Sequence, residues 1–272
     1  MYLPIPPQLD CLSAWREALR AVDALPSHSA HNVVIDISNP TINTMRAEPR
    51  LAIVDDYLVN HGKSLETVAN TIFPAALYRR YGSPEFFNVF RDKVLPKVCR
   101  NKRWSGYYFE RMMQLPEATG VARNQLYDII ERMRNPKVSA LNKFELTLFD
   151  PSRDVDNSPY GGQCLSFLSF KIIPDQKRRV SLTAMYRNHF YIEKLLSNLI
   201  GLGRLLEFVA LETGLDIGSL TVLSTHAEVD LPNGSKRSDL QTMINSFDQA
   251  VSNSPMNGSS GESQGEQAVC MP

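Results

Sequence analysis

The distribution of hydrophobic and polar positions is most informative in the second half of the chain. The segments 164–172 (CLSFLSFKI) and 179–187 (RVSLTAMYR) are rich in β-branched and aromatic residues, and a polar, basic turn separates them. Residues 190–213 follow as an apolar helical stretch, and Gly214 occupies the position of a left-handed helix cap. The segment 219–226 (SLTVLSTH) has strand character again. This half therefore predicts strand, strand, long buried helix, strand.

The first half has mostly helical periodicity. Trp15, Leu19 and Val22 share one face of a helix predicted over Leu12–Leu25, and a short buried strand is predicted at 32–37. Caps and prolines then divide a helical region from about residue 49 onward. Its predicted helices are 51–60, 65–80, 85–97 and 123–133, before a strand at 144–149. We expect one α+β domain over residues 1–251, with a last helix at 238–251, and a disordered Ser/Gly/Asn/Glu-rich tail at 252–272.

Composition narrows the functional classes. The 272 residues include 29 Lys+Arg and 29 Asp+Glu, so the zero net charge provides no bulk attraction to nucleic acid or to an anionic membrane. The four cysteines are scattered without paired metal spacing, and the N-terminus has no signal-peptide pattern, which favours a reduced, cytoplasmic protein. The most apolar window, Leu195–Leu211, contains Arg204 and Glu207 and is too short to span a bilayer.

Chemically capable side chains stand at the ends of the predicted elements. Cys164 opens the first strand, Arg187-Asn188 follows the second, Asn198 lies eleven residues past that arginine in the helix, and His226 ends the last strand. The helix ends in a Thr-Gly-Leu-x-x-Gly turn at 213–218. This order and spacing resemble the thymidylate synthase family over about residues 125–230. The resemblance implies a thymidylate-synthase-like sheet with a long buried helix, behind a mostly helical N-terminal portion.

The resemblance assigns a role to each of these positions. Cys164 would be the nucleophile that adds to C6 of a uracil ring and activates C5 for a one-carbon transfer. A neighbouring guanidinium, Arg187, would raise the thiolate fraction of that cysteine. Arg187 and Asn188 stand where the family holds the nucleotide phosphate. Asn198 stands at the base-reading position, where an amide suits uracil and a carboxylate would suit cytosine.

Three further positions complete the implied site. His226 corresponds to a histidine of a water network near the base and sugar. Glu228 stands where the family has a tyrosine on the sugar hydroxyl, so ribose and deoxyribose both stay open. In the family an Arg-Arg pair from the partner subunit completes the phosphate site, and here the pair becomes Asn142-Lys143, of which Lys143 keeps the charge.

Other positions depart from the family pattern. Phe190 replaces an aspartate, and Gln163 and Leu165 flank the cysteine in place of Pro and His. The helix that should supply a general acid or base Glu aligns near 67–74, where Asn70 is the nearest polar residue. An amide cannot accept a proton at neutral pH, which places the complete methyl-forming reaction in question.

Two remaining features have weaker implications. A basic, aromatic block could stack a pterin or a base, or could be an ordinary helix start; its members are Arg100, Lys102, Arg103, Trp104, Tyr107, Tyr108 and Arg111. His28 and His31 form an isolated loop pair, and we expect no metal site.

The sequence thus favours a homodimeric transferase of nucleotide biosynthesis. It would act on a uridine-type nucleoside monophosphate with a 5,10-methylenetetrahydrofolate-like donor. Two alternatives stay open: a nucleotide-binding protein of the same fold that has lost the chemistry, and an enzyme acting on an altered pyrimidine. Retained nucleotide affinity without exchange of the C5 hydrogen would favour the first alternative.

Overall fold

The computed structural model describes residues 2–44, 47–98, 106–116, 120, 122–155, 162–174 and 176–252. Most of the predicted basic, aromatic block and the predicted tail beyond residue 252 lie outside these residues.

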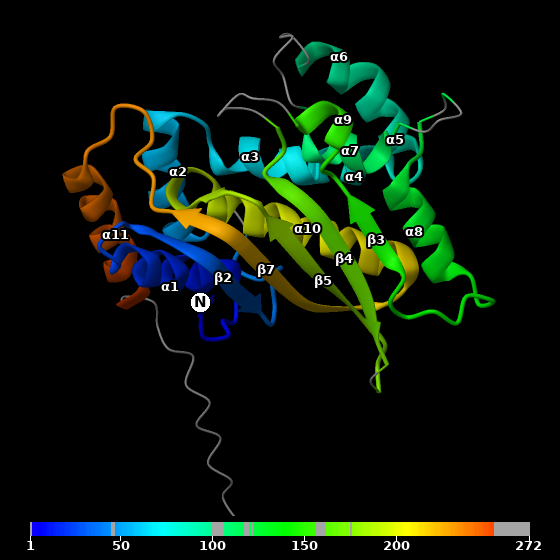
Figure 1. Ribbon diagram of the computed structural model, residues 1–272, viewed down its shortest axis with the longest axis horizontal. Helices are drawn as coiled ribbons and strands as arrows, with labels where there is room; N and C mark the ends of the chain where they lie inside the picture. Colours follow the sequence, from blue (N-terminus) through cyan, green and yellow to red (C-terminus); the bar gives the residue numbers. More distant parts are fainter. Residues whose placement is uncertain are drawn as a thin grey trace, which may run out of the picture.

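A mixed seven-stranded sheet organises the described part of the chain (Figure 1). Its strand order is β1-β2-β7-β5-β4-β3, with β6 paired to β7. The strands are β1 (Leu3–Pro4), β2 (Ser29–Ile37), β3 (Phe144–Thr147), β4 (Leu165–Ile173), β5 (Arg179–Tyr186), β6 (His189–Phe190) and β7 (Asp216–Glu228). Strands β5 and β7 run parallel, whereas β7 with β2, β5 with β4, and β4 with β3 are antiparallel.

The other regular elements of the described structure are helices, several of them short. They are α1 (Cys11–Asp23), α2 (Pro49–His61), α3 (Leu65–Ile72), α4 (Ala75–Tyr81), α5 (Glu85–Val89), α6 (Leu95–Val98), α7 (Tyr108–Met113), α8 (Gln125–Arg134), α9 (Pro151–Asp154), α10 (Leu196–Thr213) and α11 (Arg237–Ser252). Two π-helical turns, η1 (Phe90–Val94) and η2 (Tyr191–Leu195), lead directly into α6 and α10.

Helix α10 connects the parallel strands β5 and β7 and lies behind them and β4 in Figure 1. It is buried on nearly every side because it packs between the sheet and α3. Gly203 permits a close approach: a Cβ there would lie 2.5 Å from the carbonyl oxygen of Pro40. Gly214 ends the helix with φ +67°, as the sequence predicts.

The start of this helical unit is held by a carboxylate. Asp230, just past β7, accepts hydrogen bonds from the backbone N–H of Ile192 at 2.8 Å and of Glu193 at 3.2 Å. Two N–H groups that a helix start leaves without partners are thereby satisfied, and negative charge sits at the positive end of the helix dipole. The end of β7 is thus fixed to the beginning of η2.

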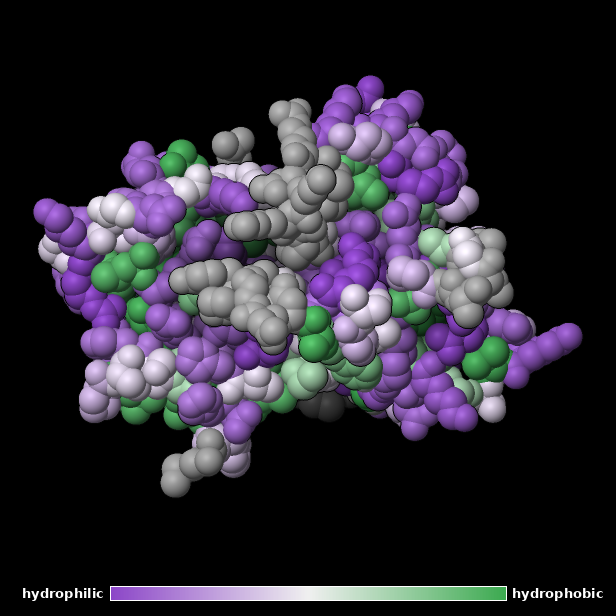
Figure 2. Space-filling view, turned by 45° about the horizontal axis from the view of Figure 1, so that its top comes forward, coloured by the Kyte–Doolittle hydropathy of each residue, from purple (hydrophilic) through white to green (hydrophobic). Residues whose placement is uncertain are grey.

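The α+β class and most predicted elements are confirmed. The predicted helix 65–80 is wrong as one element, because it divides into α3 and α4 at Phe73-Pro74, where proline cannot continue the hydrogen-bond ladder. The strand predicted at 32–37 is longer in the structure, since β2 begins at Ser29. Strand β7 extends the predicted 219–226 at both ends. On the side shown in Figure 2, the described surface is mostly hydrophilic, with hydrophobic residues in small separate groups.

Candidate functional site

The predicted site residues gather at one edge of the sheet. In the register, Leu165 of β4 lies opposite Tyr186 of β5, and Tyr186 lies beside Ser224 of β7. The start of β4 and the carboxyl ends of β5 and β7 therefore meet. The parallel pair β5–β7 and its connecting helix form a β-α-β unit, and the carboxyl ends of parallel strands are where such units place ligand sites.

Cys164 lies at this edge, directly before β4, and is partly buried. Its carbonyl oxygen accepts a hydrogen bond from the backbone N–H of Arg187 at 2.9 Å, which fixes the two residues side by side. Burial raises the pKa of the thiol, while the positive charges of Arg187 and Lys194 lower it by less. The predicted effect of Arg187 has the right sign, but burial outweighs it, so the thiol is favoured over the thiolate at neutral pH.

Arg187 extends from the end of β5 and is exposed. Its Nε donates a hydrogen bond to the carbonyl oxygen of Gln163 at 3.0 Å. Gly162 has φ +72°, and a Cβ at this position would lie 3.4 Å from Nη2 of Arg187. Gly162 therefore gives the guanidinium space beside the loop.

Asn188 and His226 form a direct pair. Oδ1 of Asn188 lies 2.6 Å from Nδ1 of His226. Because an amide oxygen only accepts, Nδ1 carries the proton, and Nε2 of a neutral His226 is left as an acceptor. The ring of His226 also lies 5.3 Å from that of His31 on the neighbouring strand β2. The structure thus brings together the predicted residues Cys164, Arg187, Asn188 and His226.

Asn198 has a different environment from the one expected of a base-reading residue. It lies in the first turn of α10, is only 2% exposed, and its Nδ2 lies 3.0 Å from Nε2 of His189. Its Oδ1 is buried and has no hydrogen-bond partner among the described residues. Contact between Asn198 and a base would therefore require the side chains above that oxygen to move.

The remaining two predicted residues differ in their placement. Glu228 ends β7, two positions past His226, and is partly buried. Lys143 is exposed and directly precedes β3, whose Phe144 pairs with Phe170 of β4. At about 3.3 Å per residue, that register places Lys143 roughly 20 Å along the sheet from Cys164 of the same chain. Within one chain, Lys143 is not part of the cluster.

Three further residues lie near Cys164, and of these the sequence analysis names only Tyr108, as a member of the basic, aromatic block. Tyr108, on α7, is partly buried; desolvation and the charge of Cys164 raise the pKa of its hydroxyl, which lies near backbone groups of Cys164 and Leu165. Tyr186 is fully buried, and burial with the charges of Tyr108 and Cys164 raises its pKa. Lys194, in η2, is close enough for its charge to act on Cys164. No local motif marks Tyr186 or Lys194, and the fold brings Tyr108 to them from a distant segment of the chain.

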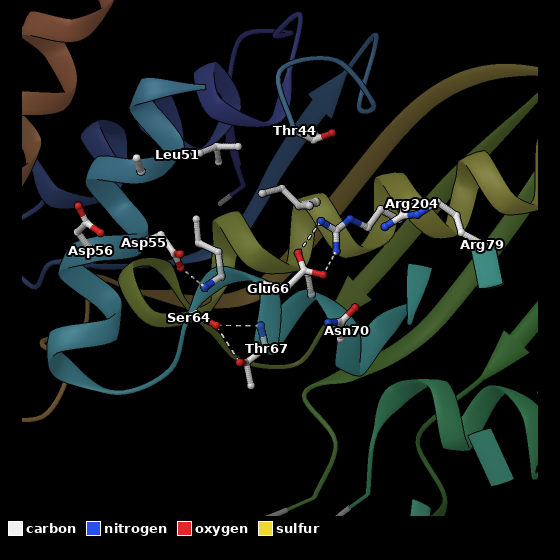
Figure 3. A pocket seen from close by; sticks show the side chains of 14 residues that line it. Thr44, Leu51, Asp55, Asp56, Ser64, Glu66, Thr67, Asn70, Arg79 and Arg204 are labelled. Atoms are coloured by element: carbon white, nitrogen blue, oxygen red, sulfur yellow. Dashed lines mark hydrogen bonds and ion pairs between the residues drawn. The ribbon is translucent and has the colours of Figure 1, made fainter. Parts of the chain in front are cut away.

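A polar cavity of about 840 Å³ opens between α2, α3 and α10 (Figure 3). We call it the α3 cavity. Its lining includes Thr44, Leu51, Ala52, Asp55, Asp56, Ser64, Leu65, Glu66, Thr67, Ala69, Asn70, Arg79, Ile200 and Arg204. The helix that lacks the expected Glu therefore still faces a cavity, with Asn70 in its wall.

Glu66, one turn before Asn70, is the nearest carboxylate on that helix face. Arg204 Nη1 and Nη2 donate hydrogen bonds to its two oxygens at 3.1 and 2.8 Å. Burial raises the pKa of Glu66, but the bonds from Arg204 and Asn70 outweigh burial and leave the pKa below its ordinary value. Glu66 is therefore an ion-paired carboxylate and is poorly suited to act as a general acid.

Within the described residues, no group of three or more His, Cys, Asp or Glu side chains is arranged to hold a metal ion. The same residues contain no helix that is both long enough and apolar enough to cross a membrane.

Comparison with known proteins agrees with the resemblance at a coarse level. No protein-family model matches the chain. The "Putative thymidylate synthase" of Methanothermobacter thermautotrophicus is 27% identical over 167 residues, covering 54% of this chain and 70% of its own length. The protein of that name from Methanothermobacter marburgensis is 28% identical over 106 residues, covering 39% of this chain and 44% of its own length. The protein of that name from Methanococcoides burtonii is 32% identical over 108 residues, covering 39% of this chain and 46% of its own length.

The chain spans less than half the length of two of these relatives. The similarities support a thymidylate-synthase-like family and do not single out a member of it.

Proposed function

We propose that the chain is a thymidylate-synthase-like transferase that adds a one-carbon unit to C5 of a uridine-type nucleoside monophosphate. The observation that carries the proposal is the joint placement of Cys164, Arg187, Asn188 and His226 at one edge of the β-α-β unit. A nucleophile, a phosphate-binding cation and a histidine–amide pair are the groups that such a reaction needs within one nucleotide length.

In the proposed reaction the thiol of Cys164 first loses its proton to solvent. The sulfur then bonds to C6 of the ring, and the electrons of the C5–C6 double bond move toward C5 and the O4 oxygen. C5 becomes an enolate carbon that can take up a proton from water, or a one-carbon group whose bond to its donor breaks as the new bond to C5 forms. Loss of the original C5 hydrogen and cleavage of the bond between sulfur and C6 restore the ring. Arg187 and Asn188 would hold the phosphate.

The proposal includes a homodimer. Lys143 lies too far from Cys164 to join the phosphate site of its own chain, so it would act on that of a second copy. On β5, Val180, Leu182, Ala184 and Tyr186 are buried, whereas the side chains between them are partly or fully exposed. The exposed side is the sheet face opposite α10, and we propose it as the surface that pairs the two copies.

The donor implied by the resemblance is 5,10-methylenetetrahydrofolate, and the α3 cavity is a poor match for it. A folate needs flat apolar contacts for its pterin and cations for its glutamate. No aromatic side chain is among the described residues that line this cavity, and three carboxylates, of Asp55, Asp56 and Glu66, face two guanidinium groups. One of those groups, on Arg204, is bonded to Glu66. We therefore place no folate in the α3 cavity and no step of the reaction on it.

The test of this function is formation of a covalent adduct with 5-fluoro-UMP and 5-fluoro-dUMP, together with tritium release from C5-labelled UMP and dUMP. We expect both signals from the unmodified chain and neither from Cys164→Ala. The matched control is Cys11→Ala, because Cys11 is a fully buried cysteine that donates to the Pro40 carbonyl oxygen, away from the cluster. Adduct formation that survives Cys164→Ala would refute the proposal.

A second candidate is a nucleotide-binding protein of this fold without transfer activity. The raised pKa of the Cys164 thiol favours it, because an enzyme of this type needs the thiolate. Measurable binding of UMP or dUMP, with no tritium release under any donor, would establish this alternative. Screening modified pyrimidine nucleotides by thermal shift would reveal an altered substrate, since a ligand at 100 times its Kd stabilises by about 2.7 kcal/mol.

A further inference from the structure

A buried histidine fixes the amide of Asn198, and the sequence-based site gives this histidine no role. His189, in β6, is 1% exposed. Its Nε2 lies 3.0 Å from Nδ2 of Asn198, and its Nδ1 lies 3.0 Å from Oγ of Ser224 on β7. Its ring stacks on Tyr186, with ring centroids 4.0 Å apart and planes 12° from parallel. Three elements therefore hold the imidazole in one position.

The positions of the protons follow from these partners. Burial lowers the pKa of His189 to about 3, so the ring is neutral and carries a single N–H. The amide nitrogen of Asn198 can only donate, so Nε2 of His189 is the acceptor. The proton must then be on Nδ1, from which it is donated to Oγ of Ser224. His189 thus orients the Asn198 amide with its nitrogen inward.

This orientation leaves the carbonyl oxygen of Asn198 as the group without a partner. Oδ1 is buried and accepts no hydrogen bond from the described residues. A buried acceptor without a donor is unfavourable, because no hydrogen bond compensates its removal from water. A ligand that brought an N–H to this oxygen would supply that hydrogen bond, whereas a ligand that brought another acceptor would add a repulsion.

We propose that His189 and Ser224 are positioning residues that keep Asn198 as a hydrogen-bond acceptor, so that the site selects pyrimidines with a hydrogen on N3. The proposal rests on the proposed function. Uracil carries an N–H at N3, whereas N3 of cytosine is an acceptor, and a methyl group on N3 removes the donor from uracil. Asn198 would thus discriminate through the one amide atom that His189 leaves without a partner, once the side chains that bury this oxygen move aside on binding.

Affinities for UMP, CMP and N3-methyl-UMP, measured by calorimetry, test the proposal. We expect the unmodified chain to bind UMP at least tenfold more tightly than the other two, a difference of about 1.4 kcal/mol. His189→Phe retains a ring that can stack on Tyr186 and lacks the acceptor, so the freed amide can turn and the preference for UMP over CMP should fall toward unity. His189→Gln retains an acceptor and should keep the preference.

Circular dichroism and thermal unfolding check that each variant is folded. If folded His189→Phe discriminates between UMP and CMP as well as the unmodified chain does, the positioning role is refuted. A purely structural role would lower the affinity for both nucleotides equally and would leave their ratio unchanged.

A measurement on the ligand-free chain separates this inference from the proposed function. The ¹⁵N chemical shifts of the His189 ring should show the proton on Nδ1, and a proton on Nε2 would overturn the amide orientation whatever the chain binds. If no pyrimidine nucleotide binds the unmodified chain, the proposed function and the selection at N3 both fail. If UMP binds with no preference over CMP, only the selection by Asn198 fails.

Discussion

Acid should destabilise this protein through His189, and the structure sets the size of the effect. The ring is 1% exposed, and burial lowers its pKa from the ordinary 6.5 to about 3. Between pH 6.5 and pH 3, His189 is protonated in the unfolded chain and neutral in the folded chain. The stability that the neutral ring contributes is therefore fully present above about pH 6.5 and is lost as the pH falls toward 3.

At pH 4, about 2.5 pH units below the ordinary pKa of 6.5 and still above the folded pKa of about 3, each unit corresponds to 1.36 kcal/mol, so the loss is on the order of 3 kcal/mol. The assay is urea denaturation from pH 7 to pH 4 of the unmodified chain and of His189→Gln, which does not titrate. We expect the stability of the unmodified chain to fall about 3 kcal/mol further than that of the variant.

The matched control is His28→Asn, which removes an exposed histidine and keeps a residue that tolerates the φ of +49° found there. In this control His189 is unchanged, so the variant should still lose stability at acid pH through His189, unlike His189→Gln. If the profiles of His189→Gln and the unmodified chain superimpose, the folded ring accepts a proton near its ordinary pKa, and the reasoning about its burial is wrong.

Other expected outcomes concern stability. Asp154→Asn should cost about 3–5 kcal/mol in urea denaturation, because it removes the carboxylate that is ion-paired at 2.8 Å with the buried guanidinium of Arg111; the Arg111 and Asp154 side chains are 4% and 2% exposed. Gly203→Ala should lower the unfolding free energy by about 1–3 kcal/mol, since its Cβ would meet the Pro40 carbonyl oxygen at 2.5 Å, and unchanged thermal unfolding would contradict this contact. Burial raises the pKa of Asp230 from 3.8 to about 6. The stability that protonated Asp230 contributes to the folded state is therefore present below pH 3.8 and lost as the pH rises through 6. Relative to the unmodified chain, Asp230→Asn should be more stable at pH 7 than at pH 4 in urea denaturation.

The second half of the fold could be predicted from the sequence because its signals are local. A run of β-branched residues forms a strand whatever its partner, and Gly214 ends α10 through its own backbone freedom. The same locality explains why Arg187 and His226 were expected at element ends. Strand order is a property of the whole chain, and no local pattern shows that β2 and β5 flank β7.

The environment of Asn198 could not be predicted for a related reason. Whether an amide in a helix faces a ligand or a buried histidine depends on where β6 crosses the helix start, which is set by the pairing of His189 with Ala227. The upward shift in the pKa of Cys164 is likewise a balance between burial and charge, and burial is known only once the fold is known.

The carboxylate of Asp230 at the start of η2 has a consequence for how anions exchange at the site. The N-terminus of a helix is a common binding site for phosphate, but here the carboxylate of Asp230 occupies that position. Under the proposed function, a bound phosphate would instead be held by the exposed guanidinium of Arg187 and by Lys143 of a second copy. Dissolved ions compete well for such exposed groups. The residence time of the bound nucleotide would therefore depend on ionic strength and on the concentration of the second subunit rather than on closure of a pocket.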